Sequence, residues 1–170
     1  MMFHRPVYAP NVILVDLPEQ QLQKAIPQLM KHIAMNNQII GVNALSDDYS
    51  LASRKIIIHN EEYEVYRELP SDTDNPSRYL LDSGAKVAYY IDASSDTFKA
   101  AFVHVYDLIG DEYPIICVSN ELTNHLNSSF TIVDSISAST NPDKIDARCM
   151  KLNEFLNLNI KYKDNKFIVE

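Results

Sequence analysis

Hydrophobic positions along this chain form short continuous runs that alternate with longer runs at helical spacing. The clearest case lies between residues 86 and 120. Apolar runs at 87–91 and 115–118 flank an amphipathic run at 98–110. A short unbroken apolar run is typical of a strand covered on both faces, and the run between them has the spacing of a helix. The pattern therefore predicts a strand–helix–strand unit with a parallel sheet.

The predicted helix of this unit has an apolar face and signals at both ends. Ser95 or Asp96 can cap its start, and Gly110 stands where helices commonly end on a glycine. The apolar face consists of Phe98, Ala101, Phe102, Val105 and Ile109.

The residues before this unit predict a strand, a helix and a second strand. The first strand spans 11–16 and the second 38–42. Pro27 removes one helical hydrogen bond, so the helix is either kinked there or begins late, near Gln23. The apolar face of this helix consists of Leu22, Ala25, Ile26, Leu29, Met30 and Ile33.

Two strands at 54–59 and 62–67 are predicted to form a hairpin with a tight turn at Asn60 and Glu61. Side chains of two kinds alternate along the second strand, which is typical of a strand with one side facing solvent. One set of alternating positions is Tyr63, Val65 and Arg67, and the other is Glu62, Glu64 and Tyr66. A helical turn at 78–84 is expected to follow.

The C-terminal part predicts a short strand at 130–133, a helix opened by Asn141 and Pro142, and a strand pair around Asp164–Asn165. The buried face of that helix is predicted to comprise Ile145, Cys149, Leu152, Phe155 and Leu156.

Together the patterns predict one α/β domain over residues 1–170, with a core at about 11–157 and an extra strand pair at 158–170. We expect three layers: a mostly parallel sheet with one antiparallel hairpin at its edge, and helices on both faces.

Composition excludes several classes of function. The chain has 23 acidic and 15 basic residues and a net charge of −8, which disfavours nucleic acid as a partner. No apolar run is long enough to span a membrane. Cys117 and Cys149 are expected to be reduced core residues, which indicates a cytoplasmic protein. His59, His104 and His125 share no ligand spacing with cysteines or acids, so no metal is expected. We also expect no cofactor.

Three stretches resemble the small Ras-like GTPases, and most closely the bacterial gliding-motility type that works with roadblock-type partners. Residues 91–98 resemble the family's approach to its third helix. Residues 114–120 have the spacing of the strand that leads into the guanine-reading motif, and Ser137-Ala138 stands where the family has its Ser-Ala guanine loop. The resemblance implies a P-loop GTPase-like sheet.

The residues that bind phosphate in that family are missing. The family needs Gly-x4-Gly-Lys-Ser/Thr after its first strand, since backbone N–H groups and a lysine hold the phosphates. Here Asp16 and Gln21 replace the two glycines, Leu22 replaces the lysine and Gln23 replaces the hydroxyl residue.

The remaining nucleotide motifs are also degenerate. The family's Asp-x-x-Gly aligns with a stretch that begins at Glu68 and lacks the glycine. Asn120 is retained, but Glu121 and Thr123 replace the lysine and aspartate of the guanine motif. The resemblance therefore implies a pseudo-GTPase without GTP hydrolysis. A strand order foreign to the family, or a guanine nucleotide bound beside Leu22, would refute this interpretation.

A pseudo-GTPase is expected to act by binding protein, here a roadblock-type or other regulatory partner in a cytosolic signalling or motility complex. Four tyrosines in and around the hairpin are candidates for the binding face, because tyrosine is enriched at interfaces. They are Tyr49, Tyr63, Tyr66 and Tyr79.

Two other hypotheses remain open. The chain partly resembles a response-regulator receiver, with Asp92 as phospho-acceptor, Asp16 holding Mg²⁺ and Ser119 as the neighbouring hydroxyl. Against this, Asn141 replaces the lysine that receivers place before proline. The third hypothesis is an α/β domain that binds a small ligand at the carboxyl ends of its strands.

Overall fold

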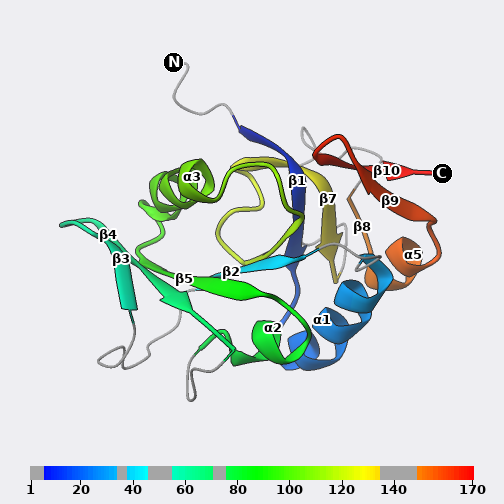
Figure 1. Ribbon diagram of the computed structural model, residues 1–170, viewed down its shortest axis with the longest axis horizontal. Helices are drawn as coiled ribbons and strands as arrows, with labels where there is room; N and C mark the ends of the chain where they lie inside the picture. Colours follow the sequence, from blue (N-terminus) through cyan, green and yellow to red (C-terminus); the bar gives the residue numbers. More distant parts are fainter. Residues whose placement is uncertain (1–5, 34–37, 46–54, 71–75, 135–148) are drawn as a thin grey trace.

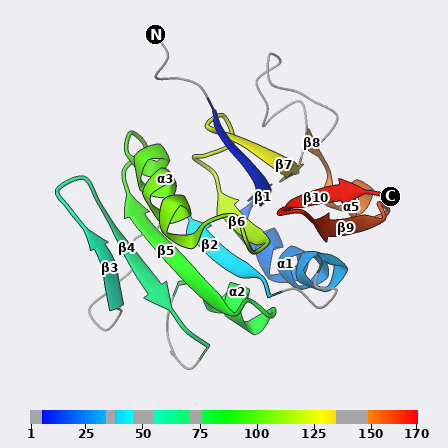
Figure 2. The ribbon, with the colours of Figure 1, turned by 45° about the horizontal axis from the view of Figure 1, so that its top comes forward.

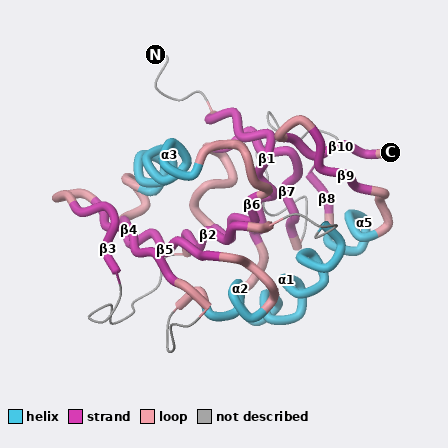
Figure 3. The backbone as a smooth tube through the Cα atoms, in the orientation of Figure 1, coloured by secondary structure: helices cyan, strands magenta, loops and turns pink. Residues whose placement is uncertain are grey.

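The computed structural model describes residues 6–33, 38–45, 55–70, 76–134 and 149–170. Figures 1 and 3 show the arrangement of its helices and strands. In chain order these are β1 (Val7–Asp16), α1 (Glu19–Ile33), β2 (Ile40–Ala44), β3 (Lys55–His59), β4 (Tyr63–Glu68), α2 (Arg78–Asp82), β5 (Val87–Ala93), α3 (Phe98–Ile109), β6 (Ile115–Ser119), β7 (Leu126–Val133), β8 (Cys149–Met150), α5 (Leu152–Leu156), β9 (Ile160–Lys163) and β10 (Lys166–Val169).

Eight strands form one mixed sheet in the order β3-β4-β5-β2-β6-β1-β7-β8. From β5 to β8 every neighbouring pair is parallel, whereas β3 with β4 and β4 with β5 are antiparallel. The hairpin β3–β4 forms one edge of the sheet (Figure 2). The predicted α/β class, the mostly parallel sheet and the antiparallel edge hairpin are confirmed.

Two hydrophobic clusters cover the two faces of the sheet. One contains the buried side of α1 together with Leu80 and Phe155, and the other contains the buried side of α3. All six residues predicted for the apolar face of α1 are buried. The helix runs from Glu19 through Pro27, so the alternative start near Gln23 is wrong.

The strand–helix–strand unit forms as β5, α3 and β6, but β5 and β6 do not pair, because β2 lies between them. Gly110 ends α3 with a φ of 79°, a backbone conformation that glycine adopts without strain. The predicted caps Ser95 and Asp96 are wrong. Thr97 is the N-cap residue, and its hydroxyl accepts a hydrogen bond from the Ser94 N–H at 3.0 Å.

The sheet bears on two further residues. Tyr66, a candidate for the binding face, is 4% exposed, and its ring lies beside that of Tyr90 with centroids 6.4 Å apart. Cys149 belongs to β8, which pairs with β7, and α5 begins only at Leu152. The predicted helix start at 141–142 lies outside the described residues.

The predicted C-terminal strand pair is confirmed as a separate antiparallel sheet, β9 with β10. Asp164 and Asn165 between the strands have φ values of 55° and 62°. Two successive residues with positive φ are typical of the tight turn that suits the twist of a hairpin. Ile160 and Phe167 are buried in the same cluster as α1, so this hairpin is part of the core.

A buried asparagine connects the first strand to the loop after α3. The register of β1 and β7 shifts between Ala9 and Ile13, and Asn11 lies within this irregularity with no exposed surface. Its amide nitrogen donates to the carbonyl of Tyr113 at 2.9 Å and to that of Gly110 at 3.4 Å, and its oxygen accepts from the Tyr106 hydroxyl. Asn11 thereby holds β1, α3 and the approach to β6 together.

Within the described ranges, no helix has the length and apolar character needed to cross a membrane.

Candidate functional site

The carboxyl ends of β1 and β6 lie next to each other, since these strands pair with Val15 opposite Val118. After β1 the chain enters α1, whose Leu22 is buried on one face of the sheet. After β6 the chain turns to the other face, where Leu122 is buried. In open α/β sheets, ligands bind where neighbouring strands send their connections to opposite faces. We call this position the switch point and define it by Asp16, Ser119 and Thr123.

The two sides of the switch point are joined by a side-chain hydrogen bond. The Thr123 hydroxyl donates to Asp16 Oδ2 at 2.6 Å. Asp16 is half-buried, and this burial raises the pKa of its carboxyl group. The bond from Thr123 opposes that increase because it stabilises the ionised form. The sequence marks Asp16 as a residue of the degenerate phosphate loop. It marks Thr123 only as the residue that replaces the aspartate of the guanine motif.

Ser119 is fully buried, and its hydroxyl is used within the fold. It donates to the Ala44 carbonyl at 3.0 Å. It also accepts the backbone N–H groups of Glu121 and Leu122 at 3.0 and 3.1 Å. This hydroxyl therefore connects β6 to β2 and shapes the loop that carries Thr123, which leaves it poorly placed to act as a nucleophile or phosphate ligand.

The start of α1 provides side chains that suit a core better than a phosphate site. Leu22 is 2% exposed and packs in the core, and Gln23 is exposed. Gln21 donates from Nε2 to Asp134 Oδ1 at 3.2 Å, at the end of the neighbouring β7. Glu19 adds another acid in the first turn of the helix. The acids near this end of the sheet disfavour a phosphate group through like-charge repulsion.

The other predicted nucleotide positions do not gather at the switch point. Glu68 is fully buried at the end of β4 and accepts a hydrogen bond from the Ser77 N–H at 3.2 Å. Asn120 is exposed after β6. Ser137 and Ala138 lie outside the described residues.

The structure separates the two aspartates of the receiver hypothesis. Asp16 ends β1 and Asp92 lies in β5, with β6 and β2 between them. Three strand spacings of about 4.8 Å place the two backbones about 14 Å apart, too far for both carboxylates to bind one Mg²⁺ ion. Asp92 instead lies opposite Glu64 of β4. The expected pairing of Asp92 with Asp16 is therefore wrong.

The candidate partner-binding tyrosines have different environments. Tyr66 is buried in the sheet, and Tyr79 is half-buried against the core cluster that contains α1. Tyr63 is half-buried at the start of β4, where its hydroxyl lies 3.0 Å from His104 Nδ1 of α3. The two rings meet edge to face. Tyr49 lies outside the described residues.

Exchange of Asp16 for asparagine should change how stability depends on pH. The folded-state pKa of this carboxyl group is raised above its ordinary value of 3.8, so the folded protein binds the proton more tightly than the unfolded chain. Ionisation of Asp16 therefore lowers stability as pH rises through that range. Asp16→Asn retains an oxygen that can accept from Thr123, and we expect its stability relative to wild type to be higher at pH 7 than at pH 3. Urea unfolding at both pH values measures this difference.

Thr123→Val provides the matched comparison, because it removes the bond that favours ionised Asp16. Its stability relative to wild type should be lower at pH 7 than at pH 3. The same pH dependence in both variants would contradict the assignment.

The strand order also bears on the Ras-like resemblance. In that family, the strand that leads into the phosphate loop lies beside the second strand of the hairpin. Here β5, β2 and β6 separate β4 from β1. This order is of the kind stated above to count against the pseudo-GTPase interpretation, so that interpretation has no support from the fold and rests on the three sequence stretches alone.

No family model, no curated protein and no solved structure matches this chain.

Proposed function

We propose that this protein acts by binding another protein and does not use nucleotide chemistry. The observation that carries the proposal is the composition of the switch point. Thr123 donates a hydrogen bond to Asp16 there. Leu22 of α1, which stands where the phosphate loop of the Ras-like family has its lysine, is part of the core. A phosphate ligand would need donors there, and these side chains offer a carboxylate and a buried apolar group instead. We expect no GTP hydrolysis.

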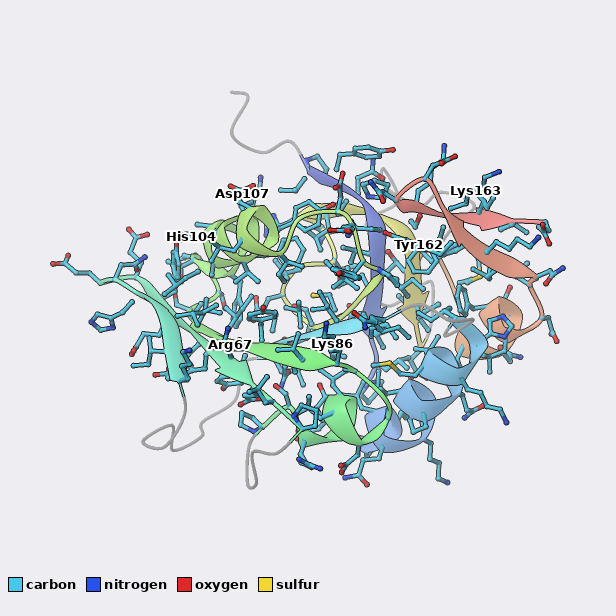
Figure 4. The ribbon with its side chains drawn as sticks, viewed as in Figure 1. Arg67, Lys86, His104, Asp107, Tyr162 and Lys163 are labelled. Atoms are coloured by element: carbon cyan, nitrogen blue, oxygen red, sulfur yellow. The ribbon has the colours of Figure 1, made fainter. Side chains whose placement is uncertain are left out.

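The proposed partner-binding face lies where the hairpin meets α3. We call it the hairpin–α3 surface and define it by Tyr63, His104 and Leu108. Figure 4 shows His104 on α3, on the side of the molecule that carries the hairpin. Leu108 follows His104 by one helical turn and is 60% exposed. An exposed leucine beside an aromatic–histidine pair has the mixed apolar and polar character of protein interfaces.

The identity of the partner rests on the sequence resemblance alone. That resemblance implies a roadblock-type protein in a cytosolic complex. Because the strand order differs from that of the Ras-like family, the binding face and the partner are tested separately.

Calorimetric titration with GTP and Mg²⁺ tests the first half of the proposal. We expect no saturable heat, and no rise in the melting temperature at GTP concentrations up to about 1 mM. A ligand with a Kd of about 10 μM would stabilise the fold by nearly 3 kcal/mol at that concentration. Micromolar binding of GTP would refute the proposal.

Site-specific cross-linking tests the second half. A photo-reactive amino acid is placed at position 108 in one variant and at the exposed position 31 of α1 in the other. In cells we expect position 108 to cross-link one protein that position 31 does not reach, and Tyr63→Ala to reduce that product at least about tenfold, as for loss of an interface aromatic. If positions 108 and 31 gave the same cross-linked product in equal amounts, the hairpin–α3 surface would not be the binding face. A roadblock-type protein in the cross-link would support the partner assignment.

A further inference from the structure

A second site lies at the opposite end of the parallel strands from the switch point. A pocket of about 270 Å³ is formed by the first residues of β1, the start of β7 and the start of β10. Tyr8, Asn127, Lys166 and Phe167 contribute to its lining. Its volume is near the lower end of the range for small-molecule sites and exceeds that of a single inorganic ion.

The pocket offers polar groups that the fold does not use. The hydroxyls of Ser128 and Ser129 are bonded to the carbonyls of Phe130 and Pro10. In contrast, the Tyr8 hydroxyl, the Asn127 amide and the Lys166 ammonium make no hydrogen bond or ion pair to the described part of the chain. Tyr8 is 67% exposed, which is unusual for so large a side chain. Three donors thus remain available to a ligand.

Positive charge is concentrated beside this pocket. Lys163 and Lys166 lie directly opposite each other across the tight turn of β9 and β10, and like charges in that position destabilise a hairpin. Lys161 on the same face is paired with Glu170 at 2.6 Å, whereas Asp164 lies in the turn itself. Figure 4 shows Lys163 on this hairpin, away from β3 and β4. An anion near Lys163 and Lys166 would relieve their repulsion.

We propose that this pocket binds a small phosphate ester. A phosphate group presents three oxygens, which matches the hydroxyl, amide and ammonium donors of Tyr8, Asn127 and Lys166. The organic part of the ester contacts the Tyr8 ring. Because the whole chain carries a charge of −8, binding depends on this local pair of lysines and not on the overall field. The site is independent of the proposed partner-binding face.

Titration of the full chain with phenyl phosphate, followed by amide NMR at constant ionic strength, tests the proposal. We expect saturable shifts centred on Tyr8, Asn127 and Lys166. Inorganic phosphate, which lacks the ring, and benzoate, which presents two terminal oxygens where phenyl phosphate presents three, should each bind more weakly. No saturable shifts, or shifts centred elsewhere, would overturn the proposal, as would benzoate binding as tightly as phenyl phosphate.

Two charge variants distinguish a site from general attraction. Lys166→Gln should weaken phenyl phosphate binding about tenfold, as expected for loss of one charge-assisted hydrogen bond. Lys31→Gln makes the same change of charge at an exposed position on α1 and should leave the affinity unchanged. An equal loss in both variants, or no loss in Lys166→Gln, would refute the site.

Discussion

Replacement of Phe155 by alanine is expected to lower the free energy of unfolding by about 4 kcal/mol, within the range for deletion of a buried phenylalanine. Phe155 has no exposed surface. Its ring meets that of Phe130 edge to face with centroids 5.1 Å apart, and that of His32 at 5.5 Å. The helix α5 has only five residues, so it depends on this contact to stay on the sheet. Urea unfolding followed by circular dichroism measures the change.

Leu156→Ala is the matched control for Phe155→Ala, because Leu156 lies in the same helix but is only half-buried. We expect it to cost about 1 kcal/mol, since less apolar surface returns to water. Hydrogen exchange should also become faster in α5 and in the neighbouring β9 in Phe155→Ala. A loss no larger than that of Leu156→Ala would show that Phe155 does not anchor the helix.

Replacement of Asn11 by alanine is expected to cost about 3 kcal/mol. The change leaves the Tyr106 hydroxyl and the Tyr113 carbonyl without their partner in a part-buried region, and desolvated polar groups without partners are costly. Burial already raises the pKa of Tyr106 to about 12, with a contribution from the negative charge of Asp111. Urea unfolding again measures the loss.

Asn11→Asp separates the role of the amide nitrogen from that of packing. It keeps the size of the side chain and the acceptor for Tyr106, but it places a carboxylate oxygen where the nitrogen donates to Tyr113. We expect a greater loss of stability at pH 7 than at pH 3, where the carboxyl group can be protonated. Asn153→Ala, at an exposed position in α5, should change stability by less than about 0.5 kcal/mol. If Asn11→Ala behaved like Asn153→Ala, the proposed role of Asn11 would be wrong.

The errors of the sequence-based predictions have a common cause. Tyr66 is a candidate for the binding face from its residue type and its place in the hairpin, and neither shows that its ring is buried beside Tyr90 in the sheet. The spacing of Cys149 to Leu152 fits a helix, yet Cys149 pairs with β7 as part of β8. The sequence gives no sign of the role of Asn11, because a polar residue next to an apolar run does not reveal partners about one hundred residues away.

At the candidate site too, some features could be predicted from the sequence and others depend on the tertiary structure. Asp16 could be recognised from the sequence because it follows a buried strand. That Thr123 would bond to Asp16, and that Asp92 would lie three strands away, depend on the order of strands in the sheet. Strand order depends on where the connections cross and on which long-range contacts form. A linear pattern of apolar residues does not contain this information.

By itself, the sequence determined the helices α1, α2 and α3, most of the strands, the mostly parallel character of the sheet and the turn at Asp164–Asn165. These features follow from the burial of one helical face or of whole strands and from backbone preferences, which act between near neighbours in the chain. Only the tertiary structure decided the order of the strands, the contact between Asp16 and Thr123, and the meeting of Tyr8, Asn127 and Lys166 around one pocket. Those contacts join residues far apart in the chain, so they form only when the whole sheet has assembled.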